Sequence, residues 1–268
     1  MLDIHNHLIS GLDDGPHTEK ETLEICKAAE EYEVHKIVAT PHYMEGKYEP
    51  EGNLIRDKIE EINNNLQAKD IQVEILPGHE VHISENIIEK IKEEDILFIN
   101  DSKYILLELP MDYIPDYLDQ LFYNLSVMGY KPIIAHPERN KEVINDPGIL
   151  YNWVKDGIIF QLNAGSLFGV YGTEVKKTAL NLVDNYLVQV IASDCHGKSM
   201  AGLEWMARAK RKLEDICGSY TIQFFTNAEY IINNEEIIYE EPARFESKSF
   251  WDIFNKFNFV EGKSSKKD

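Results

Sequence analysis

The sequence predicts an α/β fold in which a parallel sheet closes, or nearly closes, into a barrel of seven strand–helix units. Three observations predict it. Short apolar runs alternate with longer amphipathic stretches along the chain, which is typical of parallel strands joined by right-handed crossovers. The length of 268 residues is sufficient, since such a barrel needs about 250 residues. Histidine and carboxylate residues gather where the predicted strands end, the face at which barrels build active sites.

The strands are predicted from short runs of mostly apolar residues. Because helices pack outside the barrel and side chains fill its inside, these runs are expected to be apolar on both faces. The second run is ended by Pro41, which has no N–H to donate to a neighbouring strand. In order, the predicted strands are residues 2–7, 36–40, 71–77, 104–109, 131–135, 158–162 and 187–192.

The helices are predicted from the amphipathic stretches between these runs. Thr18 and Glu21 match a capping box, in which each side chain accepts a hydrogen bond from the other residue's backbone N–H. The second helix has its apolar residues on one stripe, namely Leu54, Ile55, Ile59, Ile62 and Leu66. In order, the predicted helices are residues 18–33, 51–69, 83–92, 115–128, 148–156, 174–185 and 200–217.

Residues 1–240 are predicted to form a single domain, because no linker or low-complexity stretch interrupts them. Residues 241–268 form a C-terminal aromatic segment and tail. The aromatic residues of this segment are Phe245, Phe250, Trp251, Phe254, Phe257 and Phe259. Their helical spacing favours a helix packed on the barrel, with contact to a partner or a membrane as the alternative. Residues 262–268 are predicted to be disordered.

The composition excludes several partners. The formal net charge of −20 argues against a nucleic-acid interface, which needs a basic face. No run approaches the ~20 apolar residues of a membrane span, so direct membrane insertion is not expected. The first residues lack a signal-peptide pattern. Cys26, Cys195 and Cys217 are an odd number without a C-x-x-C pair, which favours a reducing, cytoplasmic location.

Candidate metal ligands follow the predicted strands. The first strand ends in His5-Asn6-His7, and side chains at positions i and i+2 point to the same side, so both imidazoles can reach one ion. Five of the nine histidines lie at the ends of four predicted strands. The candidate ligands are His5, His7, Asp14, His42, Glu80, Glu108, His136, Asp194 and His196.

These nine candidates exceed the needs of one ion, so two or three bridged ions are predicted. Ligation by imidazole and carboxylate without thiolate suits Mn²⁺, Fe²⁺, Zn²⁺ or Mg²⁺ chemistry more than a closed structural zinc site. Cys195 is predicted to be structural, since its side chain should point away from the ligands beside it. An isolated histidine at a strand end is more often a surface residue, and this interpretation is applied to His17, His35, His79 and His82.

Such a cluster predicts hydrolysis of a phosphate ester by attack of a metal-bridged hydroxide on phosphorus. Arg139, three residues after His136, can clamp a phosphate with two hydrogen bonds. Nucleotide-binding glycine loops and a Gly-x-Ser-x-Gly elbow are absent from the sequence. A thiol phosphatase would need an arginine six residues after its cysteine, where this chain has Tyr32, Ala201 and Gln223.

These motifs resemble those of the polymerase-and-histidinol-phosphatase (PHP) superfamily. Within it they are similar to the bacterial manganese-dependent protein-tyrosine phosphatases of capsule and exopolysaccharide operons, the CpsB/YwqE type. The resemblance covers roughly residues 1–240 and is specific in order and spacing. The motifs that carry it are Asp3-Ile4-His5-Asn6-His7, Leu12-Asp13-Asp14-Gly15, Ala39-Thr40-Pro41-His42, Gly78-His79-Glu80, Ala135-His136-Pro137-Glu138-Arg139-Asn140 and Ala192-Ser193-Asp194-Cys195-His196.

The resemblance implies a distorted (βα)7, TIM-like barrel with three divalent metal ions, Mn²⁺ first and Fe²⁺, Zn²⁺ or Mg²⁺ as alternatives. It also implies Arg139, His42 and Asp194 as catalytic residues. The implied ligand sets are His5, His7, Glu80 and Asp194 for one ion, Glu80, Glu108 and His136 for a second, and Asp14, His42 and His196 for the third.

The implied substrate is phosphotyrosine in the C-terminal tail of a bacterial tyrosine kinase, with a role in regulating capsular or exopolysaccharide synthesis. One departure from the family is clear. A second arginine often follows the last motif, whereas this chain offers Lys198, which can bind a phosphate only as a point charge. Two alternatives stay open: a small-molecule phosphatase of the histidinol-phosphate type, and a non-catalytic, metal-dependent scaffold that binds phosphopeptides.

Overall fold

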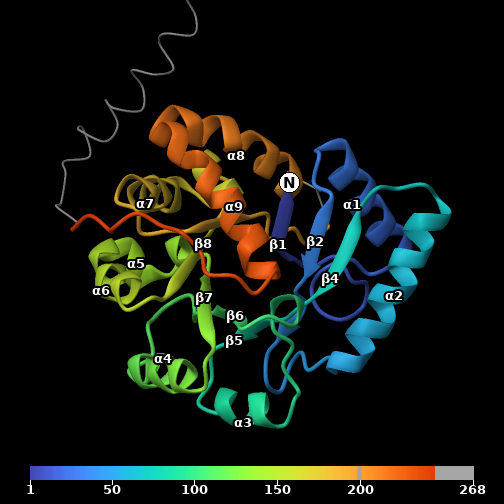
Figure 1. Cartoon of the computed structure of the whole chain (residues 1–268), viewed down its shortest axis with the longest axis horizontal. Helices are drawn as coiled ribbons and strands as arrows, with labels where there is room; N and C mark the ends of the chain where they lie inside the picture. Colours follow the sequence, from blue (N-terminus) through green and yellow to red (C-terminus); the bar gives the residue numbers. More distant parts are fainter. Residues whose placement is uncertain (198–200, 245–268) are drawn as a thin grey trace, which may run out of the picture.

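Parallel strands form the wall of a distorted barrel in the computed structural model, which describes residues 1–197 and 201–244 (Figure 1). Two hydrogen-bonded sheets contribute, in the strand orders β1-β2-β4 and β3-β5-β6-β7-β8-β9. The strands are β1 (Leu2–Asn6), β2 (Lys36–Ala39), β3 (His42–Tyr43), β4 (Glu74–Pro77), β5 (Glu80–His82), β6 (Tyr104–Glu108), β7 (Lys131–Ala135), β8 (Ile159–Asn163) and β9 (Val190–Ala192).

Two breaks at the same height distort the wall. β2 pairs with β4 as far as Ala39 and Pro77, and β3 pairs with β5 from His42 and Glu80 onward. Pro41 and Pro77 have no N–H to donate, so neither ladder continues through this level. Each of the predicted strands 36–40 and 71–77 is therefore followed by a second short strand, β3 after the first and β5 after the second. The predicted parallel α/β architecture is confirmed.

The first and last strands meet and close the barrel. The backbone N–H of His7 donates to the carbonyl of Cys195 at 3.0 Å, and the N–H of Asp194 donates to the carbonyl of His5 at 3.0 Å. Both hydrogen bonds lie at the strand ends that carry predicted metal ligands. Closure of the wall therefore places the motifs at residues 5–7 and 194–196 side by side.

Apolar side chains fill the inside of the barrel below these ligands. Leu2, Ile4 and Leu106 belong to one buried cluster there. Helix α9 (Thr221–Ile232), which the sequence analysis did not predict, lies across this end of the barrel and contributes Ala228 and Ile231 to the same cluster (Figure 1). The interior is thus a packed core at one end and polar at the other.

The remaining helices pack around the outside (Figure 1). They are α1 (Glu19–Glu31), α2 (Gly52–Ala68), α3 (Ile87–Lys92), α4 (Leu118–Val127), α5 (Lys141–Asn145), α6 (Leu150–Lys155), α7 (Thr173–Asp184) and α8 (Ala201–Cys217). The capping box of Thr18 and Glu21 is confirmed at the start of α1. The buried stripe on α2 is narrower than predicted: Ile55, Ile59 and Leu66 are buried, but Leu54 is exposed.

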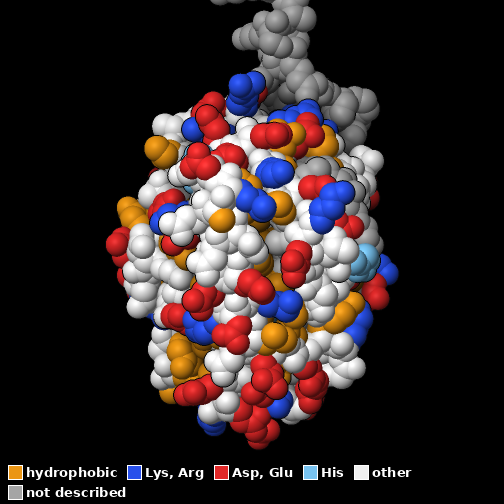
Figure 2. All heavy atoms as spheres, turned by 90° about the vertical axis from the view of Figure 1, so that its right-hand side faces the viewer, with side chains coloured by type: hydrophobic (Ala, Val, Ile, Leu, Met, Phe, Trp, Pro, Cys, Tyr) orange, Lys and Arg blue, Asp and Glu red, His pale blue; other side chains and the backbone are white. Residues whose placement is uncertain are grey.

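Charged side chains of both signs are interspersed on the face shown in Figure 2. Among the described residues, no helix is long and apolar enough to cross a membrane. The described chain after α9 runs back along the barrel, with hydrogen bonds from Asn227 Nδ2 to the carbonyl of Ile238 and from the N–H of Ala243 to the carbonyl of Asn185. The predictions for the aromatic segment 245–259 and for residues 262–268 lie outside the described residues.

Candidate metal centre and active site

An irregularity in β1 turns two histidines toward the inside of the barrel. Between Asp3 and Asn6, β1 has one residue more than its partner β2, and such an extra residue shifts the alternation of side chains.

His5 Nδ1 lies 2.8 Å from Gln161 Oε1. Because that oxygen can only accept, Nδ1 carries a proton, and Nε2 is the nitrogen whose lone pair becomes available to a cation when the ring is neutral. The Nε2 atoms of His5 and His7 lie 3.1 Å apart, as their i, i+2 spacing predicts.

Asp13 orients His7 in the same way. Its Oδ2 lies 2.6 Å from His7 Nδ1 and accepts the backbone N–H of His42 at 3.0 Å, and its Oδ1 accepts the N–H of Gly15 at 2.9 Å. A Cβ at position 15 would collide with the carbonyl oxygen of His7, so only glycine lets this loop pack so closely. The carboxylate fixes the ring tautomer and leaves His7 Nε2 facing the cluster.

Four ligand atoms form the most buried group. His5 Nε2 and His7 Nε2 each lie 3.2 Å from Glu80 Oε2, and they lie 3.4 and 3.6 Å from Asp194 Oδ1. Four ligands placed tetrahedrally about 2.0–2.1 Å from a cation would be about 3.3 Å apart. The arrangement therefore has the size of a coordination shell.

Glu80 connects this group to a second one. Its other oxygen, Oε1, lies 3.0 Å from His136 Nε2, which is also 3.7 Å from Glu108 Oε1. His42 Nδ1 lies 3.0 Å from Glu80 Oε2 and 3.8 Å from Glu108 Oε2. A carboxylate that presents one oxygen to each of two ligand groups is suited to bridge two cations.

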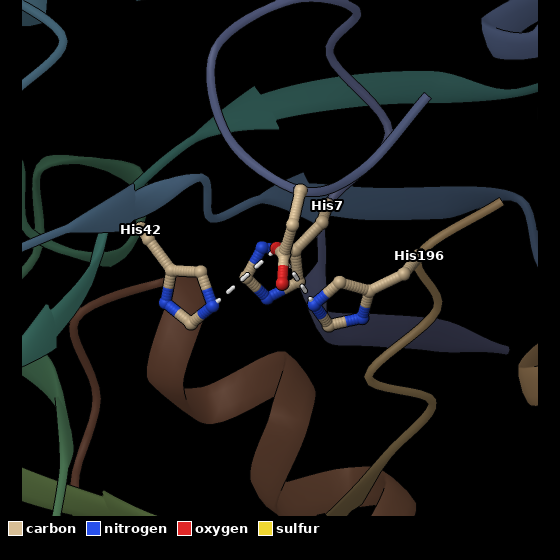
Figure 3. A group of neighbouring side chains, drawn as sticks. His7, His42 and His196 are labelled. Carbon is tan, nitrogen blue, oxygen red and sulfur yellow. Dashed lines mark ion pairs between the residues drawn. The ribbon is translucent and has the colours of Figure 1, made fainter. Parts of the chain in front are cut away.

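A third group lies nearer the solvent. Asp14 Oδ1 is 3.6 Å from His42 Nε2 and 3.3 Å from His196 Nε2. The rings of His7 and His196 stack with their centroids 4.0 Å apart. Figure 3 shows His7, His42 and His196 converging from separate segments of the chain. His42 uses one ring nitrogen toward this group and the other toward Glu80 and Glu108.

The donor set fits divalent cations. Glu80 Oε2 and Asp194 Oδ1 are buried and have no hydrogen-bond partner in the described part of the chain, which is costly unless a cation or proton compensates them. Potential ligand atoms form three overlapping groups, and within each group all the atoms lie within 4.8 Å of one another. Together the three groups contain His5, His7, Asp14, His42, Glu80, Glu108 and His196. His136 and Asp194 adjoin them through Glu80 and the two N-terminal histidines.

The charges of the cluster shift its pKa values in opposite directions. Burial lowers the pKa of His5, but the charges of Glu80 and Asp194 outweigh burial and raise it to about 9. Burial raises the pKa of Asp194, but the charges of His5 and His136 outweigh burial and lower it to about 2. Protons on imidazoles therefore compensate the buried carboxylates in the metal-free protein, and a cation would compete with those protons.

Two predicted ligands have left-handed backbone conformations, His136 with φ of 30° and Asp194 with φ of 51°. Such residues cost about 1–3 kcal/mol each and are typical of functional sites. Hydrogen bonds hold the backbone at both positions. The N–H of Arg139 donates to the carbonyl of His136 at 3.0 Å, and the N–H of Asp194 donates to the carbonyl of His5. The backbone thus aims these two side chains at the cluster.

Arg139 stands at the edge of the cluster. Its Nη1 donates to Asp194 Oδ2 at 3.0 Å, and its guanidinium lies over the ring of Tyr171 at 4.6 Å. Asn163 Nδ2 donates to the same oxygen of Asp194 at 2.6 Å. Two donors therefore hold Oδ2, so that Oδ1 faces the ligand group, and Arg139 keeps further donors for an anion.

Comparison with known proteins identifies the family. Residues 1–233 match the capsular polysaccharide synthesis family CpsB/CapC. The chain belongs to this family. It is 35% identical to the tyrosine-protein phosphatase YwqE of Bacillus subtilis (strain 168), over 95% of this chain and all of that protein. It is 36% identical to the putative tyrosine-protein phosphatase CapC of Staphylococcus aureus, over 94% of this chain and 98% of that protein.

A solved structure supports the same assignment. The fold is similar to that described in crystal structures of YwqE from Bacillus subtilis and CpsB from Streptococcus pneumoniae, unique metal-dependent tyrosine phosphatases. The match has a TM-score of 0.87 and 35% identity, and it covers 92% of this chain and all of the other. The predicted family and the predicted distorted barrel are therefore confirmed for this CpsB/CapC family member.

The structure brings all nine predicted ligands of this CpsB/CapC protein into one cluster at the strand ends. Arg139 joins them. Cys195 is buried among apolar side chains, and burial raises the pKa of its thiol to about 11, so its predicted structural role agrees with its surroundings. Lys198 lies outside the described residues.

Two of the histidines interpreted as surface residues are corrected by the structure. His79 is buried: its Nδ1 accepts the backbone N–H of Leu97 at 3.0 Å, and burial lowers its pKa to about 3. His82 is partly buried, with Nδ1 3.2 Å from Glu108 Oε2, so it orients a predicted ligand. Neither role was visible in the sequence, because both depend on partners from distant segments of the chain, Leu97 for His79 and Glu108 in β6 for His82. His17 and His35 are exposed as predicted.

The sequence analysis also missed the residues that support the ligands. Asp13, Gln161 and Asn163 each hold a ligand side chain by one hydrogen bond. The signal for Asp13 was present, since it adjoins Asp14, but the sequence does not say which carboxylate faces the cluster. Gln161 and Asn163 could have been noticed as polar residues at i, i+2 in an otherwise apolar strand.

Proposed function

We propose that this CpsB/CapC family member is a metal-dependent protein-tyrosine phosphatase that hydrolyses phosphotyrosine on a cognate bacterial tyrosine kinase and so regulates capsular or exopolysaccharide synthesis. The observation that carries the proposal is the set of ligand groups sharing Glu80, with Arg139 beside them. Ligands that share a carboxylate suit bridged cations, and an adjacent guanidinium suits a phosphate.

Exposure indicates the direction from which substrate arrives. The side chains of His5, His7 and Glu80 are fully buried, whereas those of His196 and Asp14 are 31% and 51% exposed. Arg139 is also open to solvent, with 26% of its side chain exposed. The phosphate group would therefore enter past Asp14 and His196 and meet Arg139 at the edge of the cluster.

Three divalent ions, Mn²⁺ in the first instance, are proposed as the cofactors, held by the three ligand sets given above. When bound, they would supply a water activated as nucleophile and positive charge for the phosphoryl oxygens. Arg139 would hold those oxygens with its remaining donors, in the orientation set by Asp194 and Tyr171. His42 is proposed as a catalytic residue because it contacts Asp14 in one ligand group and Glu80 in another. Asp194 is proposed as a catalytic residue because it contacts Arg139, the residue that would hold the phosphate.

A tyrosine phenol with an ordinary pKa of about 10 is a fair leaving group, so a dedicated general acid is not required. A cytoplasmic location is part of the proposal. Burial raises the pKa of the Cys26 thiol to about 12 and also raises the pKa of Cys217, and thiols kept in this state suit a reducing compartment.

Turnover assays would test the proposal. Purified protein with Mn²⁺ is compared on a phosphotyrosine peptide, a phosphoserine peptide and histidinol phosphate. We expect the phosphotyrosine peptide to be hydrolysed and His136→Ala to lose at least 100-fold in kcat, because it removes a ligand beside the bridging Glu80. The exposed His35→Ala serves as a matched control and should retain wild-type turnover.

The other outcomes separate the alternatives. Turnover of histidinol phosphate alone would favour a small-molecule phosphatase. Metal-dependent binding of the phosphotyrosine peptide without turnover would favour a scaffold. Full activity in His136→Ala would refute the metal mechanism.

A further inference from the structure

The loop between β6 and α4, residues 109–117, adjoins both parts of the proposed site. It starts directly after the predicted ligand Glu108, and its backbone carbonyls accept hydrogen bonds from Asn140, the residue that follows Arg139. We call it the rim loop. Its role in binding the substrate's peptide chain rests on the function proposed above.

Asn140 ties the rim loop in place. Its Nδ2 donates to the carbonyls of Pro110 at 2.7 Å and Tyr113 at 3.0 Å. Its Oδ1 accepts the N–H groups of Glu142 at 2.9 Å and Val143 at 3.1 Å, which caps α5. Only 2% of Asn140 is exposed, so every hydrogen-bonding atom of this buried amide is used.

A second attachment follows immediately. The N–H of Lys141 donates to the carbonyl of Met111 at 2.9 Å. Three carbonyls of the rim loop are thus fixed by two consecutive residues next to Arg139. Surface loops are ordinarily among the more mobile parts of a protein, so a loop fixed at three points beside a phosphate-binding residue has a defined shape before substrate arrives.

The fixed loop presents apolar side chains to solvent. Met111 is 36% exposed and Tyr113 is 55% exposed. Tyr171, which stacks on Arg139, adjoins Val170, which is 50% exposed. Apolar surface that is both exposed and held rigid is suited to binding, because little entropy is lost when a ligand covers it.

We propose that the rim loop, positioned by Asn140, binds the substrate's peptide chain beside the phosphotyrosine and selects an apolar side chain there, through Met111 and Tyr113. The hydrogen bonds from Asn140 and Lys141, the two residues after Arg139, to the rim loop indicate the occupant. A phosphotyrosine whose phosphate reaches Arg139 brings its main chain within reach of this adjoining loop. Asn140 is therefore a positioning residue, and Tyr113 and Met111 determine specificity.

Two phosphotyrosine peptides of equal charge test this inference, one with leucine and one with serine on both sides of the phosphotyrosine. p-Nitrophenyl phosphate, which has no flanking chain, is the reference substrate. With Mn²⁺ present, we expect the wild-type protein to show a kcat/KM about fivefold to tenfold higher for the leucine peptide, the effect of partly covering one apolar side chain.

The variants locate that preference. In Tyr113→Ser the ratio between the two peptides should fall below about twofold. Tyr123→Ser removes a comparably exposed tyrosine from α4, away from the rim loop, and should keep the wild-type ratio. Asn140→Asp keeps the oxygen that caps α5 but loses both donations to the loop, and should lower the same ratio, which a general loss of stability would not change.

The results distinguish the two levels of the argument. Equal kcat/KM for both peptides in the wild type, or the same ratio in Tyr113→Ser and Tyr123→Ser, would overturn the role of the rim loop and leave the proposed phosphatase function intact. Absence of turnover of every substrate, p-nitrophenyl phosphate included, by the wild-type protein with Mn²⁺ would overturn the proposed function itself, and with it this inference.

Discussion

Single side chains at the edge of the cluster determine how its ligands point. Each of the two N-terminal histidines has one nitrogen held by a neighbour and the other free for a cation, through Gln161 for His5 and Asp13 for His7. Such supporting contacts typically change metal affinity by about 10–100-fold. The supporting residues are therefore as testable as the ligands.

Asp13→Asn is the sharpest change at this scale. The amide has a single acceptor oxygen, so it can keep the contact with the N–H of Gly15 at Oδ1 but not that with the N–H of His42 at Oδ2, and it does not carry the charge that now faces His7 Nδ1. We expect the Mn²⁺ concentration for half-maximal activity to rise about tenfold or more, with activity recovering at high Mn²⁺. A metal titration of phosphatase activity measures this.

Asp146→Asn is the matched control. Asp146 also accepts a backbone N–H, that of Gly148 at 3.0 Å, but at the surface and away from the cluster, so its variant should need no additional Mn²⁺. An unchanged Mn²⁺ requirement in Asp13→Asn would show that this carboxylate does not support a metal ligand.

The convergence of the candidate ligands could be predicted from the sequence, whereas the supporting residues could not. Polar residues at strand ends stand out against apolar runs, and parallel strands bring their carboxyl ends to one face. The supporting contacts depend on which residues of different strands face one another, for example His5 in β1 and Gln161 in β8. That pairing follows from strand register, and here the register is changed by the extra residue in β1 and by the breaks at Pro41 and Pro77.

Among the elements, α9 has the largest role that the sequence did not indicate. It closes the apolar end of the barrel, opposite the ligands, and Asn227 is its buried polar attachment. Asn227 Nδ2 donates to the carbonyls of Gln189 at 2.8 Å and Ile238 at 2.9 Å, and its Oδ1 accepts the N–H of Ile238 at 3.0 Å. One amide therefore joins α9, the start of β9 and the chain that follows α9.

Asn227→Leu should destabilise the protein without changing the metal site. Loss of the amide leaves three backbone groups without partners, and each unsatisfied buried group costs about 1–3 kcal/mol. Partial access to water reduces the sum of these costs, so we expect the free energy of unfolding to fall by about 2–4 kcal/mol and Tm to fall by several degrees, measured by thermal unfolding.

Asn152→Leu, at an exposed position of α6, is the control and should change the free energy of unfolding by less than about 0.5 kcal/mol. Equal Tm shifts in the two variants would contradict this role of Asn227.

At the scale of the whole molecule, the polar and apolar ends of the barrel have separate tasks. The apolar end holds the fold together, while the polar end places nine ionisable candidate ligands in one region. The net charge of −20 would repel a phosphorylated substrate from the metal-free protein. Metal binding therefore matters for substrate affinity as well as for the chemical step.

Metal loading should release protons at neutral pH. The pKa of His5 is about 9 in the metal-free protein, and that of His7 is raised well above its ordinary value despite burial, by Asp13 and Glu80. The imidazole of His5 is thus protonated at pH 7, and its protonation contributes stability to the metal-free fold that is fully present below pH 6.5 and is lost as the pH rises through about 9. A cation binds only the neutral ring, so it must displace these protons.

Calorimetry in buffers of different ionisation enthalpy measures the displaced protons. At pH 7 the heat of Mn²⁺ binding should depend on the buffer and indicate release of at least one proton, because the pKa of His5 lies about two units higher. Near pH 10 this dependence should become smaller, since the imidazole of His5 is then already neutral. His35→Ala, at the exposed surface, should give the same proton release as the wild type. Heat independent of the buffer at pH 7 would mean that the cluster is neutral before the metal binds, and that the opposite charges of His5, Glu80 and Asp194 do not compensate one another in the metal-free protein.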